Sequence, residues 1–187
     1  YRIWNEYNIS GNEIAAPSVA GDMTWATLKG NHQRKEFILG TEDKNNNVKF
    51  QIYDVTTKSW NNLSSNSDGS NAALRAFDIA YEEVSGDALI VYENSAASNS
   101  VFAYRTWNGT DYSAEQTFTT DLTAGVISWV ALTPDKRSDS IMALIHNNVG
   151  DLYAVPWNGT GFVGAKNSTL SSATISSTEQ HFAFAWE

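Results

Sequence analysis

The sequence lacks cysteine altogether and has few basic residues, and each shortage excludes a class of protein. Without cysteine there is neither a disulfide nor a thiolate metal site, although the compartment stays open because oxidising conditions permit disulfides without requiring them. The 12 basic residues are outnumbered by 21 acidic ones. Binding to phosphate backbones depends on clustered Lys and Arg, so nucleic acid is not an expected partner.

Long apolar runs are also missing. No segment approaches the roughly 20 apolar residues that a membrane helix needs, and the chain does not open on a charged-then-apolar leader. We therefore expect no membrane insertion by this chain. What the sequence does contain is enough apolar material, 42% of 187 residues with 12% aromatic, to fill a core.

The two ends of the chain match segments inside it. Tyr1–Asn5 matches Tyr104–Asn108, and Phe182–Glu187 matches Phe77–Glu82. Both matches give a period of about 104 residues, which Trp-Asn dipeptides divide into units of about 50 residues. These dipeptides begin at Trp4, Trp60, Trp107 and Trp157. We predict one domain of four quasi-repeats, at about 18–66, 74–120, 124–170, and 181–187 joined with 1–14.

Each unit reads as a series of β-strands. Phe77, Ile79 and Tyr81 alternate with other residues at the period of two that a pleated strand requires. The middle strands at 88–92 and 141–145 are apolar on both faces and need cover on both sides. Asn-Gly after the tryptophans of the second and third units predicts tight turns. The Ser- and Asn-rich stretch 61–71 predicts a loop between repeats.

Units of this length with four antiparallel strands are typical of β-propeller blades. We therefore predict an all-β, β-propeller-like domain whose fourth blade is split between the termini. Tyr53–Leu63 resembles the second half of a kelch blade. The doubled Tyr-Arg-x-Trp-Asn pattern resembles tandem repeats of bacterial and archaeal surface proteins. That resemblance implies a non-catalytic module that is extracellular or on the cell surface.

The split fourth unit is short, because Glu83–Ala103 has no counterpart between Glu187 and Tyr1. Three explanations stay open: an incomplete blade, a piece of a longer array, or a strand lent by a neighbouring subunit. Open strand edges pair readily with other chains. A copy of this chain, or another surface subunit, is therefore an expected partner.

Catalytic and metal-binding patterns are weak. The histidines lie in unrelated phases of the repeat, and there is no Gly-x-Ser-x-Gly elbow. The paired glutamates Glu82 and Glu83, with Glu187, lie at strand ends where carboxylates could flank a glycosidic bond. The equivalence of Glu82 and Glu187 favours a structural role. We predict no enzyme activity and no cofactor.

The polar segment that ends the first unit has some features of a calcium-binding loop. Asn66, Asp68 and Ser70 alternate oxygen-bearing side chains around a glycine. Calcium needs six to eight oxygen ligands, and no acidic residue follows at the closing position. We predict a flexible polar loop and no metal site.

Sugar binding is the main alternative function. Sugars stack on aromatic faces while Arg and Glu bind hydroxyl groups, so Arg105 with Trp107, and Arg2 with Trp4, are candidate ligand-binding residues. The competing interpretation is that these tryptophans fill space between blades and that the arginine stems cover them.

Five Asn-x-Ser/Thr sequons are candidate glycosylation sites, although the chain is so rich in Asn, Ser and Thr that chance accounts for most of them. They begin at Asn8, Asn62, Asn108, Asn158 and Asn167. Together these patterns predict a structural or adhesive module of an extracellular, surface or filamentous assembly. A carbohydrate-binding propeller lectin is the alternative.

Overall fold

The computed structural model describes residues 1–2, 9, 13, 15–18, 21–66, 74–94, 101–120, 125–164, 168–171 and 179–187. Within these residues the fold is all-β, as predicted, and consists of three four-stranded antiparallel sheets, which we call blades 1, 2 and 3. Blade 1 contains β1 (Met23–Asn31), β2 (Glu36–Asp43), β3 (Val48–Asp54) and β4 (Ser59–Asn66). Blade 2 contains β5 (Phe77–Tyr81), β6 (Ala88–Glu93), β7 (Val101–Trp107) and β8 (Gln116–Thr119). Blade 3 contains β9 (Ile127–Pro134), β10 (Ile141–Asn147), β11 (Leu152–Trp157) and β12 (Ser168–Ser171).

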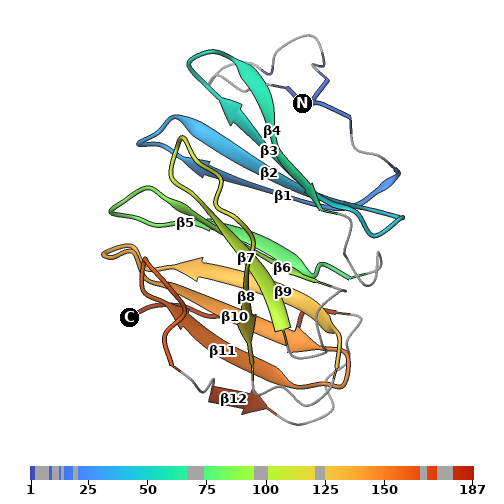
Figure 1. Cartoon of the computed structure of the whole chain (residues 1–187), viewed down its shortest axis with the longest axis vertical. Coiled ribbons are helices and arrows are strands. Elements are labelled where there is room, and N and C mark those ends of the chain that lie inside the picture. The colour runs from blue at the N-terminus through green and yellow to red at the C-terminus, as the bar shows by residue number, and fades with distance from the viewer. Residues whose placement is uncertain are drawn as a thin grey trace.

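Within each blade the strands pair in chain order, and the blades stack face to face along the long axis of the molecule (Figure 1). Blades meet mainly through their first strands, since β5 contacts both β1 and β9. The amide N–H of Leu132 in β9 donates to the Asp78 carboxylate in β5 over 2.9 Å, a direct link between blades 2 and 3. The result is a propeller-like arc of three blades.

Two apolar layers hold the arc together, and both lie between blades. The layer between blades 1 and 2 is centred on Ile38, Phe50, Phe77 and Ile90. The layer between blades 2 and 3 is centred on Phe102, Val130, Ile145 and Trp157. Blade 2 is buried on both sides. Its middle strand β6 is accordingly buried throughout, as predicted from its apolar residues on both faces.

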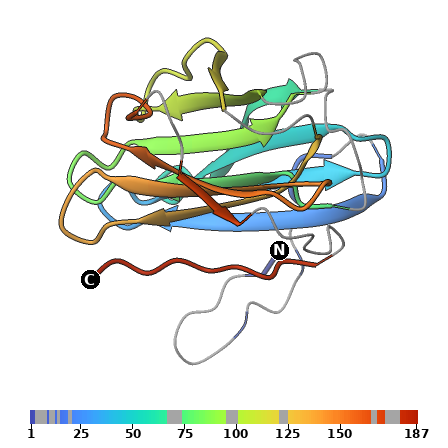
Figure 2. The same ribbon diagram turned by 90° about the horizontal axis from the view of Figure 1, so that it is seen from below.

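The predicted fourth blade is not present as a sheet in the described residues, and a closed ring is not shown. The fragments assigned to it lie on opposite outer faces of the arc. Tyr1 packs on blade 1 against the rings of Tyr53 and Trp60, with centroids 5.6 and 5.7 Å away. The 179–187 segment runs extended along blade 3 (Figure 2). The segment is held there by Trp186, whose indole N–H donates to the carbonyl oxygen of Thr133 over 2.9 Å.

One prediction for blade 1 was wrong. Residues 61–66 were predicted to be loop but complete β4, and Trp60 lies near the start of that strand. Trp60 pairs with Tyr53, just as Tyr112 bridges Trp107. The Trp-Asn dipeptide therefore has a different phase in blade 1. The Ser/Asn-rich strand forms because its backbone pairs with β3, which needs no apolar side chains.

Asp68 and Ser70 of the polar loop lie outside the described residues. No helix in the part of the chain that the structure describes has the length and apolar character needed to cross a membrane.

Candidate functional site

Each contact between blades carries one tryptophan hydrogen bond to a buried carboxylate. Trp107, the last residue of β7, donates its indole N–H to Glu36 of blade 1 over 3.0 Å. Trp157, the last residue of β11, donates to Glu82 of blade 2 over 2.6 Å. The prediction that Glu82 is structural agrees with this contact. Burial raises the pKa of both carboxyl groups, and the indole donors oppose the shift.

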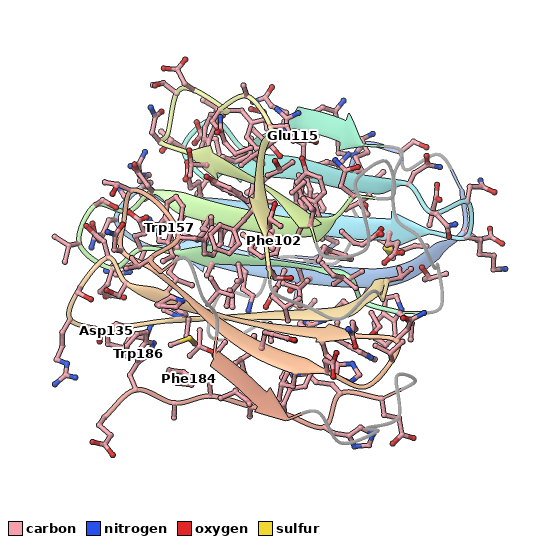
Figure 3. The ribbon with its side chains drawn as sticks, turned by 60° about the horizontal axis from the view of Figure 1, so that its bottom comes forward. Phe102, Glu115, Asp135, Trp157, Phe184 and Trp186 are labelled. Carbon is pink, nitrogen blue, oxygen red and sulfur yellow. The ribbon has the colours of Figure 1, made fainter. Side chains whose placement is uncertain are left out.

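The contact between blades 2 and 3 is closed by aromatic packing. Trp157 is 2% exposed and lies against Tyr104 and Phe162, with ring centroids 5.7 and 5.2 Å away. Phe162 also packs on Phe102 and Phe118. Figure 3 shows Trp157 and Phe102 within this layer. No room for a ligand is left beside the indole.

The contact between blades 1 and 2 is open at the same place. Trp107 is only partly buried and forms a wall of a cavity of about 680 Å³. Tyr112 replaces Phe162, and by strand register Asn66 stands where blade 2 has Phe118. The cavity is lined by polar residues of both blades besides these rings. They include Arg34, Glu36, Asp54, Asn61, Asn62, Asn108 and Thr110.

Arg34 joins the two blades at the mouth of this cavity. Its guanidinium donates to the carbonyl oxygen of Asn108 and to the carboxylate of Asp87, and over 3.2 Å to the carbonyl oxygen of Ser85. The three bonds end on the two turns of blade 2 nearest the cavity. Arg34 therefore fixes the width of the mouth.

Asp54 supplies the negative charge of the cavity. It ends β3 and accepts the backbone N–H groups of Thr57 and Thr56, which lower the pKa of its carboxyl group. Asp54 is therefore ionised at neutral pH. The amides beside it come from β4: Asn61 is exposed, and the Asn62 side-chain oxygen accepts from Gln51 over 3.1 Å. The site thus combines two aromatic rings, a fixed cation, a carboxylate and amides.

Of the predicted pair Arg105 and Trp107, the structure places Trp107 in the lining of this cavity but not Arg105. Arg105 lies on the same side of β7, yet its guanidinium is committed to the Tyr92 hydroxyl, 3.1 Å away, and to the Ser113 carbonyl, 2.8 Å away. It also lies over the ring of Tyr112. Arg105 is therefore a support for the cavity wall.

The second predicted pair is not assembled in the described residues. Arg2 lies on the outer face of blade 1, and Trp4 is outside the described residues. Arg34, which sequence reasoning missed, lies in a polar hairpin turn with no motif to mark it. Its relation to Trp107 depends on the stacking of two blades.

Of the five sequons, Asn62, Asn108 and Asn158 are exposed, whereas Asn8 and Asn167 lie outside the described residues. Asn108 and Asn158 open equivalent turns, and each side-chain oxygen accepts the N–H and hydroxyl groups of the threonine two residues on. These bonds leave the amide nitrogen, the atom that carries an N-linked glycan, toward solvent. Glycosylation itself stays a prediction.

A second set of titratable groups is buried at the opposite end of the second strands. Strand register places Glu42, Glu93 and His146 at equivalent positions in the three blades. Glu42 is fully buried, and neither carboxylate oxygen has a hydrogen-bond partner in the described structure. Burial, with the nearby Glu93 and Asp43, raises the pKa of Glu42 to about 8.

His146 is equally inaccessible, since it is fully buried and its Nδ1 lies 3.0 Å from the Ser128 hydroxyl. Glu42 and His146 are therefore both closed to a substrate. Among the described residues no group of three metal-ligating side chains is present.

Comparison with known proteins gives no family. No protein-family model matches the chain, so the kelch and surface-repeat resemblances gain no support, and no curated protein matches it either. Among solved structures, the chain is similar to a fungal lectin from Aleuria aurantia with a six-bladed β-propeller fold, at 15% identity and a TM-score of 0.46, over 79% of this chain and 47% of the lectin. A mutant of that lectin in complex with α-methyl-L-fucoside gives 15% identity and a TM-score of 0.48, over 81% and 48%. The chain spans about half the length of these lectin chains.

Proposed function

We propose that this chain binds carbohydrate in the cavity between blades 1 and 2. The observation that carries the proposal is the composition of that cavity: the rings of Trp107 and Tyr112 face polar groups from the other blade. A sugar ring has an apolar face that packs on aromatic rings and a rim of hydroxyl groups that need donors and acceptors. Asp54 supplies acceptors, and the Asn61 amide supplies both a donor and an acceptor.

The dimensions agree with this class of ligand. A volume of about 680 Å³ lies within the range of roughly 300–1,000 Å³ for small-molecule sites. The walls are held before any ligand arrives, because Arg34 fixes the mouth and the Trp107–Glu36 bond fixes the indole. Binding then costs little ordering of side chains, which favours affinity.

Calorimetric titration with a glycan panel that includes α-methyl-L-fucoside tests the proposal. The decisive variant is Asp54→Asn, matched by Asp135→Asn. Asp135 also accepts a backbone N–H in a hairpin turn, from Arg137 over 3.1 Å, but lies outside the cavity. We expect Asp54→Asn to weaken binding about tenfold through one lost charged hydrogen bond, and Asp135→Asn to leave it unchanged.

Tyr112→Ala gives a second measurement, since it removes one stacking wall and should abolish measurable binding. The absence of binding by any glycan at millimolar concentration would overturn the proposal. So would binding that is insensitive to both Asp54→Asn and Tyr112→Ala.

The structural or adhesive role predicted from the sequence is the second candidate function. The observation that favours it is the exposure of Leu28 and Phe37 on the outer face of blade 1. An extracellular or cell-surface location is part of this proposal and rests on the sequence patterns alone.

A further inference from the structure

The outer face of blade 1 has the residue pattern of a buried contact between blades. Strand register aligns Leu28 of β1 with Leu132 of β9, and Phe37 of β2 with Ile141 of β10. Leu132 and Ile141 are 5% and 0% exposed because blade 2 covers them. Leu28 and Phe37, on the outer face of blade 1, are 57% and 38% exposed.

Blade 2 confirms that these positions normally form a core. The residues of blade 2 in the same register are Ile79 and Ala88, and both are buried against blade 1. On blade 1 the exposed pair borders a hollow of about 700 Å³. Its apolar walls include Leu39, Tyr53 and Val55. Apolar surface in this arrangement marks a site of association.

The N-terminal residue shows what kind of partner the face takes. By sequence Tyr1 corresponds to Tyr104, which lies edge-on to Trp157 and Phe162, with interplanar angles of 70° and 89°. Tyr1 lies edge-on to Tyr53 and Trp60, which occupy those two positions in blade 1, at 64° and 69°. Tyr1 thus takes, against blade 1, the place that Tyr104 takes against blade 3.

The opposite end of the arc carries the matching surface. In the 179–187 segment Phe182, Phe184 and Trp186 are partly buried and Ala183 and Ala185 are exposed, in strict alternation. Figure 3 shows Phe184 and Trp186 pointing toward the sheet of blade 3.

This is the arrangement of β5, in which Phe77, Ile79 and Tyr81 pack on blade 1 while Ala80 packs on blade 3. The outward side of the terminal segment presents Ala183 and Ala185 at the positions where β5 presents Asp78 and Ala80 to blade 3.

A carboxylate completes the match. Glu187 corresponds to Glu82, which accepts the indole N–H of Trp157 across a blade contact. The residue of blade 1 in the register of Trp157 is Tyr53, whose side chain lines the hollow.

We infer that the outer face of blade 1 binds the C-terminal face of a second copy of this chain, with Glu187 of that copy at the rim beside Tyr53. The contact joins two different faces, so it repeats from copy to copy. Because successive blades turn about a common axis, we expect repetition to close into a ring of defined size.

Sedimentation and light scattering over a concentration series test the inference. We expect a mass above the 20.6 kDa of one chain that rises with concentration to a plateau. Leu28→Glu places a charge in the centre of the contact and should weaken association more than about tenfold. Val84→Glu is the matched control, because Val84 is 65% exposed and lies outside the hollow.

Both side chains are exposed, so neither change should impair folding, and an unchanged unfolding midpoint verifies this. Glu187→Gln should weaken association, whereas Glu179→Gln, an exposed carboxylate of the same segment, should not. A mass that stays at 20.6 kDa throughout would overturn the inference, as would association that survives Leu28→Glu. Sugar binding is measured separately and is unaffected by either result.

Discussion

The two contacts between blades are built on the same ladder positions but have different contents. Between blades 2 and 3 the Trp157 indole is buried under Tyr104 and Phe162, and nothing else enters. Between blades 1 and 2 the equivalent Trp107 borders a polar cavity. One repeat therefore supports either a closed contact or an open cavity, and the edge strand differs between them by Asn66 in place of Phe118.

The comparison extends to buried charge. At the ends of the second strands, blades 1 and 2 bring Glu42 close to Glu93, whereas blade 3 places His146 at the same position. A buried carboxyl group and a buried imidazole respond to pH in opposite senses. The predictions below separate the two contacts, from the largest expected effect to the smallest.

The largest effect should come from Glu42. Its folded-state pKa of about 8 lies above the ordinary 4.5, so its contribution to stability is complete below about pH 4.5 and is lost as the pH rises through 8. At about 1.36 kcal/mol per unit, the upper bound of this loss is about 5 kcal/mol.

Glu42→Gln should flatten the alkaline side of the stability profile measured by urea unfolding between pH 5 and 9. The exposed Glu179→Gln serves as the control. A variant with the same alkaline loss as the parent chain would show that Glu42 is not the group responsible.

The next effect compares the two tryptophans directly. Trp157→Ala removes a buried indole and leaves Glu82 without the hydrogen bond from that indole. The change should therefore cost about 3–5 kcal/mol in the free energy of unfolding. Trp107→Ala removes a ring that already borders an open cavity and should cost about 1–3 kcal/mol. Equal losses in urea unfolding would contradict the distinction between a closed contact and an open one.

Most of the strands could be predicted from the sequence because apolar alternation and Asn-Gly turns are local signals. The all-β class followed from the same signals, and the structural interpretation of Glu82 followed from its repeat position. The phase of blade 1 did not, since Trp60 and Tyr53 differ in type from their equivalents and only backbone pairing aligns them. The cavity could not be predicted either, because Arg34 meets Asn108 through the stacking of blades and neither position has a distinctive motif.

His146 should give a smaller effect of opposite sign. Burial, with the nearby His181, lowers its pKa, while Asp151 opposes the shift. A lowered folded-state pKa means that stability is complete above the ordinary value of 6.5 and is lost as the pH falls through the folded-state pKa. His146→Gln should therefore reduce the acid loss between pH 7 and 5 and leave the alkaline side unchanged. Acid unfolding curves that coincide with those of the parent chain would show that His146 is not the group responsible for the acid loss of stability.

The smallest effect should come from two equivalent turns, in which the two contacts between blades should not differ. Thr110 and Thr160 occupy equivalent exposed turns, and their hydroxyl groups donate to Asn108 and Asn158 over 2.9 and 3.0 Å. Since both bonds are exposed to solvent, Thr110→Ala and Thr160→Ala should each cost about 0.5 kcal/mol in urea unfolding. The unglycosylated protein should be used, because each change also removes a sequon. A larger loss for Thr160→Ala would mean that the turn, and not the buried aromatic layer, makes the contact between blades 2 and 3 the stronger one.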